Sequence, residues 1–130
     1  MKCLDTDLLI AILRGKREAQ EKVAQLDEEG KHATTSVNIF EIFFGAHRST
    51  RKSQNMKEAL KLLERLEIIP FNLSSSLRAG EISANLVAKG EIIDYRDAMI
   101  AAIAIENDLT LVTRNEAHFT RIKSLNLEIW

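Results

Sequence analysis

The chain has 130 residues, of which 45% are hydrophobic and 28% are charged, and its formal net charge is −1. This length suits one ordinary domain, expected over residues 1–130, and no apolar run approaches the ~20 residues of a membrane-spanning helix, which excludes a membrane protein. The near-neutral charge gives no indication of the strongly basic surface common among nucleic-acid binders.

The start of the chain bears on its location. Asp5 stands where a secretory signal would have its apolar stretch, so the protein is expected to be cytoplasmic. Cys3 is the only cysteine and cannot form an internal disulfide bond. Because it lies between Lys2 and Leu4 in a strand-like segment, it is expected to be a small buried residue rather than a nucleophile.

The first half of the chain predicts two strands and four helices. In order, they are a strand at residues 2–5, helices at 7–14 and 16–29, a strand at 32–37, and helices at 38–48 and 54–66. Leu8 and Ile12, at helical spacing, indicate the first helix. Gly15 and Gly30 are expected to end the first two helices, and Asn38 to open the third.

The second half continues the alternation. In order, it predicts a strand at residues 67–71, helices at 74–89 and 94–107, a strand at 110–113, a helical turn at 116–121 and a strand at 127–130. Serines 74–76 are expected to cap the first of these helices and Asp94 to start the next. The alternation predicts an α/β fold with a mostly parallel five-stranded sheet and helices on both faces.

Three acidic residues occupy positions that would meet at one edge of this sheet. Asp5 ends the first strand, whereas Glu41 and Asp97 lie in the first turns of the helices after the second strand and before the fourth. Ligands of open parallel sheets bind where strand ends meet helix N-termini. A simpler interpretation is also open, because Asn38-x-x-Glu41 and Asp94-x-x-Asp97 have the spacing of helix caps.

The neighbours of Glu41 and Asp97 favour a site over a cap. Both helices are apolar nearly all round, at residues 39–44 and 98–105, and are therefore expected to be buried. Buried carboxylates without partners are costly, and no lysine or arginine is placed by the sequence to neutralise all three. Mg²⁺ or Mn²⁺ accepts such oxygen ligands and can activate water for attack on phosphorus, so phosphodiester hydrolysis is the expected chemistry.

Four segments carry motifs in a specific order. They are Cys3-Leu4-Asp5-Thr6-Asp7, residues 34–46 around Glu41, residues 97–102 and residues 111–119, followed by a tail at 121–125 and the terminal Trp130. Each motif is weak by itself. In this order and spacing, over nearly the whole chain, they resemble the PIN domain, and more closely the VapC-type toxins within it.

The resemblance implies a three-layer α/β/α PIN-like fold and cleavage of RNA that depends on Mg²⁺ or Mn²⁺. It also implies a homodimer and inhibition by a cognate antitoxin, whose segment would lie in an apolar groove and extend a basic side chain to the acids. It carries Asp5, Glu41 and Asp97 over as the catalytic, metal-binding triad. Apolar residues at 8–13 and 40–44 are candidates for such a groove or for internal packing.

The sequence departs from the family pattern at one position. Many members have an aspartate at the fourth acidic position, where this chain has Asn115. An amide is a weaker metal ligand, so Asn115, like Thr113, is expected to hold a metal-bound water or to cap the short helix. Asp94 is expected to supply outer charge or a cap, and Thr6 is a further secondary candidate.

Basic residues are candidates for contacts with RNA. Arg14, Arg96 and Arg114 would contact phosphates from the rim of the cleft or form surface ion pairs, and the basic stretch at residues 47–52 would contact phosphates or form a solvated loop. His118 is expected to pack or cap rather than to catalyse.

Three other functions remain open from the residues. A housekeeping RNA-processing nuclease of the same fold and a non-catalytic RNA- or protein-binding member, made conceivable by Asn115, are the nearest. A phosphoryl-accepting signalling module has a similar length and layering. It requires an aspartate directly after the third strand, where this chain has Pro70, Phe71 and Asn72.

Overall fold

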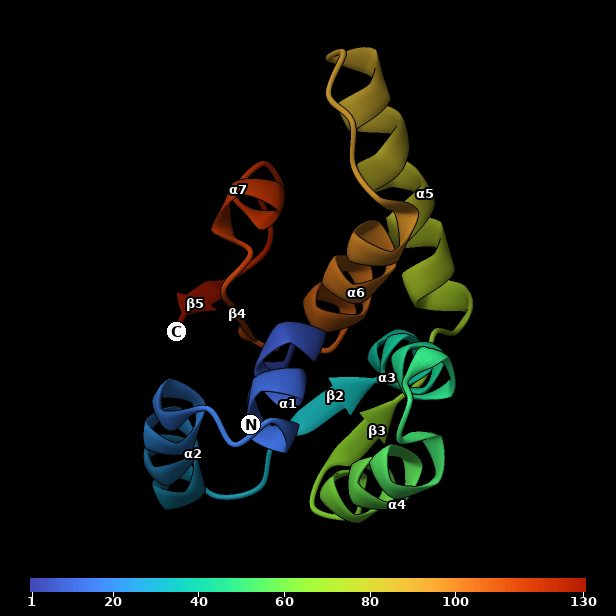
Figure 1. Ribbon diagram of the computed structural model, residues 1–130. Helices are drawn as coiled ribbons and strands as arrows, with labels where there is room; N and C mark the ends of the chain where they lie inside the picture. Colours follow the sequence, from blue (N-terminus) through green and yellow to red (C-terminus); the bar gives the residue numbers. More distant parts are fainter.

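Short strands and helices alternate along the whole chain in the computed structural model, which describes residues 1–130 (Figure 1). The strands are β1 (Cys3–Leu4), β2 (Ala33–Thr35), β3 (Glu67–Ile69), β4 (Leu111–Thr113) and β5 (Leu127–Ile129). The helices are α1 (Thr6–Leu13), α2 (Arg17–Glu29), α3 (Ser36–Arg48), α4 (Lys52–Leu63), α5 (Leu73–Ala88), α6 (Tyr95–Glu106) and α7 (Glu116–Phe119). All the elements expected from the sequence are present.

The five strands form one sheet in the order β3-β2-β1-β4-β5, and every neighbouring pair is parallel. The predicted parallel sheet is therefore confirmed. The strand order reverses at β1, which is flanked by β2 and β4, so the carboxyl ends of β1 and β4 lie at the switch point where such sheets bind ligands.

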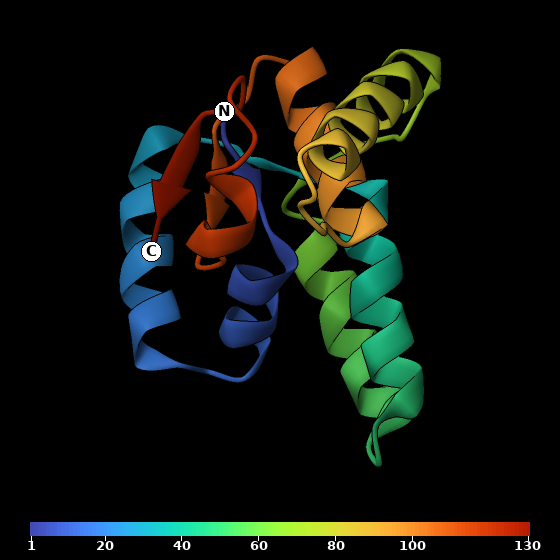
Figure 2. The same cartoon turned by 90° about the horizontal axis from the view of Figure 1, so that it is seen from above.

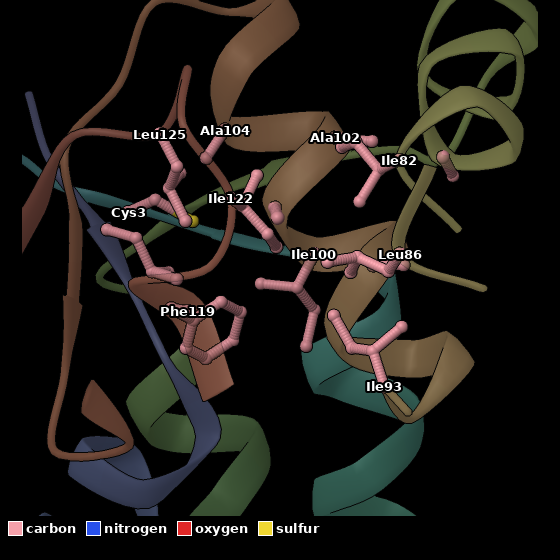
Figure 3. Packing of buried hydrophobic residues seen from close by; sticks show 14 residues of the cluster. Cys3, Ile82, Leu86, Ile93, Ile100, Ala102, Ala104, Phe119, Ile122 and Leu125 are labelled. Carbon is pink, nitrogen blue, oxygen red and sulfur yellow. The ribbon is translucent and has the colours of Figure 1, made fainter. Parts of the chain in front are cut away.

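Neighbouring residues of each strand point to opposite faces of the sheet. Helices pack on both of these faces. Cys3 and Leu111 pack into a core cluster with α5, α6 and α7 (Figure 3), whereas Leu4 and Val112 pack into a second cluster with α1, α2, α3 and α4. Figures 1 and 2 show α2 and β5 on one side of the molecule and the pairs α3–α4 and α5–α6 on the other. The three layers agree with the expected fold.

Helix α6 is a core element, as predicted. Six of its residues are buried, namely Ala98, Ile100, Ala101, Ala102, Ile103 and Ala104. The expectation that α3 is buried all round was wrong. Phe40 and Phe44 are 56% and 48% exposed, and the buried face of α3 consists of Asn38, Ile42 and Ala46.

Two helix starts differ from their predictions. Thr35, not Asn38, is the N-cap of α3, because Thr35 and Asn38 form a reciprocal capping box in which Asn38 is the third helical residue. Residues 36–37 are consequently helical rather than part of β2. Asn72 caps α5 in the same way with Ser75, so serines 74–76 lie inside the helix. None of the helices has both the length and the apolar character required to cross a bilayer.

Candidate active site

Asp5 lies at the switch point of the sheet, directly after β1, where it caps α1 by accepting a 2.8 Å hydrogen bond from the Thr6 N–H. Its side chain is only 6% exposed. Oδ1 also accepts from Asn38 Nδ2 at 3.0 Å, and Oδ2 accepts from Thr113 Oγ1 at 2.6 Å. Asp5 is thus held from three directions by groups on α1, α3 and β4.

Asn38 is a residue of this site that the sequence analysis treated only as a cap. It is fully buried, and its Oδ1 accepts hydrogen bonds from the N–H and the hydroxyl of Thr35. These bonds direct its Nδ2 toward Asp5 Oδ1 and Thr6 Oγ1, to which it donates at 3.0 and 2.8 Å. A capping box therefore orients a carboxylate on the neighbouring strand.

Glu41 lies in the second turn of α3 rather than the first, because that helix begins at Ser36. Its Oε1 accepts a 2.8 Å hydrogen bond from Thr6 Oγ1. Arg96 lies 3.7 Å from its Oε2 and also forms an ion pair with Asp94 at 2.9 Å. A cation of the protein thus reaches Glu41 but none contacts Asp5, so no arginine or lysine pairs with all three acids.

Asp97 lies in the first turn of α6, as predicted, and Asp94 is the N-cap of that helix. The Asp94 side chain caps the helix by accepting a hydrogen bond from the Arg96 N–H. Asp97 takes no part in this cap. His118 Nδ1 lies 3.1 Å from Asp97 Oδ2 and 2.9 Å from Asn115 Nδ2. Asn115 occupies the N-cap position of α7 but makes no side-chain capping bond, so the expectation that it caps was wrong.

Thr113 connects Asp5 with the segment that carries Asn115 and His118. Its hydroxyl lies 2.6 Å from Asp5 Oδ2 and 3.2 Å from Asp7 Oδ2, and it accepts a 3.1 Å hydrogen bond from the Asn115 N–H. Asp7 also accepts from the Arg114 N–H at 2.8 Å and from Trp130 Nε1 at 3.1 Å. The network thus runs from the acids to Trp130, directly after β5.

The three acids share an electrostatic environment that disfavours their charge. Burial raises the pKa of Asp5 to about 7, and the nearby charges of Asp7 and Glu41 contribute to the increase. Burial also raises the pKa of Glu41 and of Asp97, and the charge of Asp97 adds to the increase at Glu41. The pKa of Asp94 is lowered instead, chiefly by its hydrogen bond with Arg96.

The donor set suits a hydrated divalent cation better than an all-protein cage. No group of three or more Asp, Glu, His or Cys side chains is placed so that together they could hold a metal ion, so the structure does not bring the three acids into one ligand cluster. Mg²⁺, however, usually keeps several waters and is bound through one or two carboxylates together with substrate phosphates. Carboxylates with raised pKa values and mutual repulsion provide the oxygen ligands that such an ion requires.

The three candidate arginines lie in different surroundings. Arg96 is at the acids, as described above. Arg114 forms an ion pair with Glu18 at 2.6 Å and lies with its guanidinium carbon 3.6 Å from the centre of the Trp130 ring. Arg14 is exposed at the end of α1 and forms no ion pair.

Three residues contact the site although the sequence gave them no site role or only a minor one. They are Asp7, Asn38 and His118. Asp7 stands two residues after Asp5, and His118 stands one helical turn after Asn115, so both had a local signal. Asn38 had the same spacing to Thr35 that a capping box requires.

Known proteins are similar to this chain over nearly its whole length. The family model of the PIN domain matches residues 2–125. A ribonuclease VapC2 from Rickettsia felis is 35% identical over 128 residues, which cover 98% of this chain and 96% of that protein. A tRNA(fMet)-specific endonuclease VapC from Shigella flexneri is 28% identical over 127 residues, with coverages of 98% and 96%.

Solved structures agree in fold over the whole chain. VapBC2 from Rickettsia felis, bound to a DNA fragment of its promoter, superposes with a TM-score of 0.91 at 32% identity and covers 99% of this chain and 98% of that one. DNA-bound VapBC from Salmonella typhimurium gives a TM-score of 0.89 at 28% identity, with coverages of 100% and 99%.

Proposed function

This chain belongs to the PIN-domain family, with VapC ribonucleases as curated relatives, and we propose that it is a metal-dependent endoribonuclease that acts as the toxin of a toxin–antitoxin pair. The observation that carries the proposal is a chain of hydrogen bonds at the switch point of the sheet. It links Asp5 to Glu41 through Asn38 and Thr6, and it links Asp5 to Asp97 through Thr113, Asn115 and His118. Raised pKa values at all three support a site built to receive positive charge.

The chain's own residues would hold the reacting groups in place. We assign Asp5, Glu41 and Asp97 as metal ligands and catalytic carboxylates. A bound Mg²⁺ or Mn²⁺ would supply the positive charge that hydrolysis of a phosphodiester requires. Thr113 and Asn38 orient Asp5, and Thr6 orients Glu41, as hydrogen-bond partners of metal ligands do.

The other secondary residues would act through the triad. His118 holds Asp97 Oδ2 and in turn faces the Asn115 amide, which places Asn115 beside the site although it is not an acid. Asp94 holds Arg96 near Glu41, so its contribution is outer charge. An aspartate is therefore not needed at position 115 for the site to carry three carboxylates.

The proposed partners follow from the family and from one exposed surface. The related structures are VapBC assemblies, which supports a cognate antitoxin, and the family implies a homodimer in the cytoplasm. Phe40 and Phe44 stack at a centroid distance of 5.9 Å on the exposed side of α3. On the opposite side of this helix from the two phenylalanines, Ile10, Leu13 and Ile42 line a second hollow, together with polar residues such as Asn55 and Glu58. We place an apolar antitoxin segment on the phenylalanine side.

The direct test is cleavage of a mixed cellular RNA pool with Mg²⁺, with Mn²⁺ and with a chelator. The wild-type protein should cut with a metal and not with the chelator. Asp97→Asn should lower the rate by more than about 100-fold, the upper range for an outer-shell partner, because it removes a ligand. Asp108→Asn is the matched control, since Asp108 has a φ of 53°, which asparagine tolerates equally well.

The outcomes separate the alternatives. Metal-independent cleavage, or full activity of Asp97→Asn, would defeat the site assignment. No cleavage under any condition would favour a non-catalytic binding member of the fold. Induction of the gene with and without its chromosomal neighbour tests the toxin assignment: growth that lone expression leaves unchanged would favour a housekeeping nuclease instead.

A further inference from the structure

A hollow close to the acids has more basic than acidic residues in its lining. It has a volume of about 440 Å³ and nine lining residues, contributed by α1, the turn into α2, the first turn of α2, the residue after β4 and the C-terminus. Four of them are basic, namely Arg14, Lys16, Arg17 and Arg114, and two are acidic, namely Asp7 and Glu18. We call this feature the Trp130 hollow. Its positive lining contrasts with the net charge of −1 of the whole chain.

The acidic residues of the Trp130 hollow already have partners. Asp7 accepts hydrogen bonds from the Arg114 N–H and Trp130 Nε1, and Glu18 pairs with Arg114 at 2.6 Å. Arg17 pairs with Glu21, whereas Arg14 and Lys16 form no ion pair. Asp7 keeps its negative charge, because both of its partners are neutral N–H groups. Arg14 and Lys16 are the cations of the hollow that no ion pair neutralises, so they are the groups available to contact an anion.

Arg114 presents a fixed flat surface in the Trp130 hollow. Its guanidinium carbon lies 3.6 Å from the centre of the Trp130 ring, and its Nε donates a 3.1 Å hydrogen bond to the main-chain oxygen of Trp130. With the ion pair to Glu18, these contacts hold the group in one orientation while its side chain stays 48% exposed. Bases of single-stranded RNA stack on guanidinium planes held in this way.

The Trp130 hollow is joined to the proposed active site by a short path. Asp7, which lines the hollow, lies 3.2 Å from the Thr113 hydroxyl, and that hydroxyl lies 2.6 Å from Asp5 Oδ2. These hydrogen bonds show only that the two places are close. The nucleotides beside a phosphate held at the acids would therefore come within reach of the hollow. The acids repel a polymer of nucleotides, so binding energy has to come from nearby cations.

We infer that the Trp130 hollow is the subsite that binds single-stranded RNA next to the scissile phosphate, with Arg14 and Lys16 on backbone phosphates and a base on the Arg114–Trp130 stack. This inference rests on the proposed function, whose substrate it places on the surface. Each lost phosphate contact on a single strand changes the slope of log affinity against log salt by about 0.7.

The test uses charge reversal and the only tryptophan of the chain. Binding of a single-stranded oligouridylate is measured in chelator, where the proposed nuclease is silent, by anisotropy of the labelled RNA and by Trp130 emission. Arg14→Glu with Lys16→Glu should weaken binding by about tenfold or more and reduce the salt slope by about 1.4, because two phosphate contacts are lost. Lys57→Glu with Lys61→Glu makes the same charge change in a hollow on α4.

The expected pattern is specific to the Trp130 hollow. RNA should change the emission of Trp130 in the wild type and in the α4 control, and the double variant at Arg14 and Lys16 should raise KM for RNA while keeping kcat within a few-fold. Arg14→Gln with Lys16→Gln, which keeps α1 and α2 free of added acids, should show a smaller loss in the same direction.

The two proposals fail separately. Equal binding and equal salt slopes for both charge-reversal variants, or Trp130 emission unaffected by bound RNA, would overturn the subsite even if the protein cuts RNA. Loss of binding confined to the Arg14 and Lys16 variants supports the subsite, and it would do so even if no metal enabled cleavage and the nuclease assignment failed.

Discussion

Thr113 Oγ1 donates a 2.6 Å hydrogen bond to Asp5 Oδ2, although 108 residues separate the two in the chain. The pairing of β1 with β4 brings them together, and the same hydroxyl accepts from the Asn115 N–H. One side chain thus orients the most buried acid and anchors the segment that carries Asn115 and His118.

Replacement of Thr113 by valine should test this double role. The change keeps the shape but leaves Asp5 Oδ2 and the Asn115 N–H without a partner, so the free energy of unfolding should fall by about 1–3 kcal/mol. Metal-dependent cleavage should fall by about 10- to 100-fold, as for other partners of metal ligands. Thr113→Ser should restore both quantities. A valine variant with wild-type activity would contradict the proposed role.

Replacement of Asp5 by asparagine should stabilise the metal-free fold at alkaline pH. The pKa of Asp5 is about 7 in the folded chain against an ordinary value of 3.8, so ionisation of Asp5 destabilises the fold progressively from about pH 4 to pH 7 and fully above that. In chelator at pH 8, urea denaturation should give Asp5→Asn about 2–4 kcal/mol more stability than the wild type. The difference should vanish near pH 4. A variant less stable than the wild type at pH 8 would show that the hydrogen bonds of Asp5 outweigh its charge.

Metal affinity should rise with pH through the same range. A cation binds the ionised form of Asp5, so protons compete with it below about pH 7 and binding should release a proton at pH 6. Calorimetric titration with Mn²⁺ in buffers of different ionisation enthalpy measures both effects. Asp108→Asn should behave as the wild type. An affinity unchanged between pH 6 and pH 8 would argue against Asp5 as a ligand.

Phe40 and Phe44 should matter for a partner more than for the fold. Because both are about half exposed, Phe40→Ala with Phe44→Ala should change the free energy of unfolding by less than about 1 kcal/mol. The double variant should bind a co-expressed antitoxin at least about tenfold more weakly. Phe43→Ala is the contrast, because Phe43 packs against the second core cluster and should cost more stability. Unchanged antitoxin affinity would move the partner to another surface.

Local patterns were sufficient for the fold class and for the positions of two of the three acids in the fold. Asp5 ends an apolar strand and Asp97 precedes an apolar helix, and each of these relations involves neighbouring residues only. The alternation of strands and helices predicts parallel pairing without any knowledge of strand order. The same reasoning placed α3 too late, because Asn38 has the chemistry of an N-cap while Thr35 performs that role.

The contacts between distant segments could not be predicted, because they depend on strand order. Asn38 reaches Asp5 only because β2 lies next to β1, and Thr113 reaches it only because β4 lies on the other side. The exposure of Phe40 has a similar cause. An apolar helix is buried all round only where neighbours cover every side, and α3 has none beside Phe40 and Phe44.

The burial of α6 on all sides links the cleft to parts of the molecule far from it. The alanines at 101, 102 and 104 have no exposed surface, so a larger side chain at any of them must displace the helix rather than turn into solvent. Asp97 belongs to the first turn of the same helix and would move with it. A shift of about 1 Å in a reacting group can lower the reaction rate about a hundredfold. Methyl groups added at these interior alanines should therefore lower the rate of the proposed reaction, although they lie away from the acids.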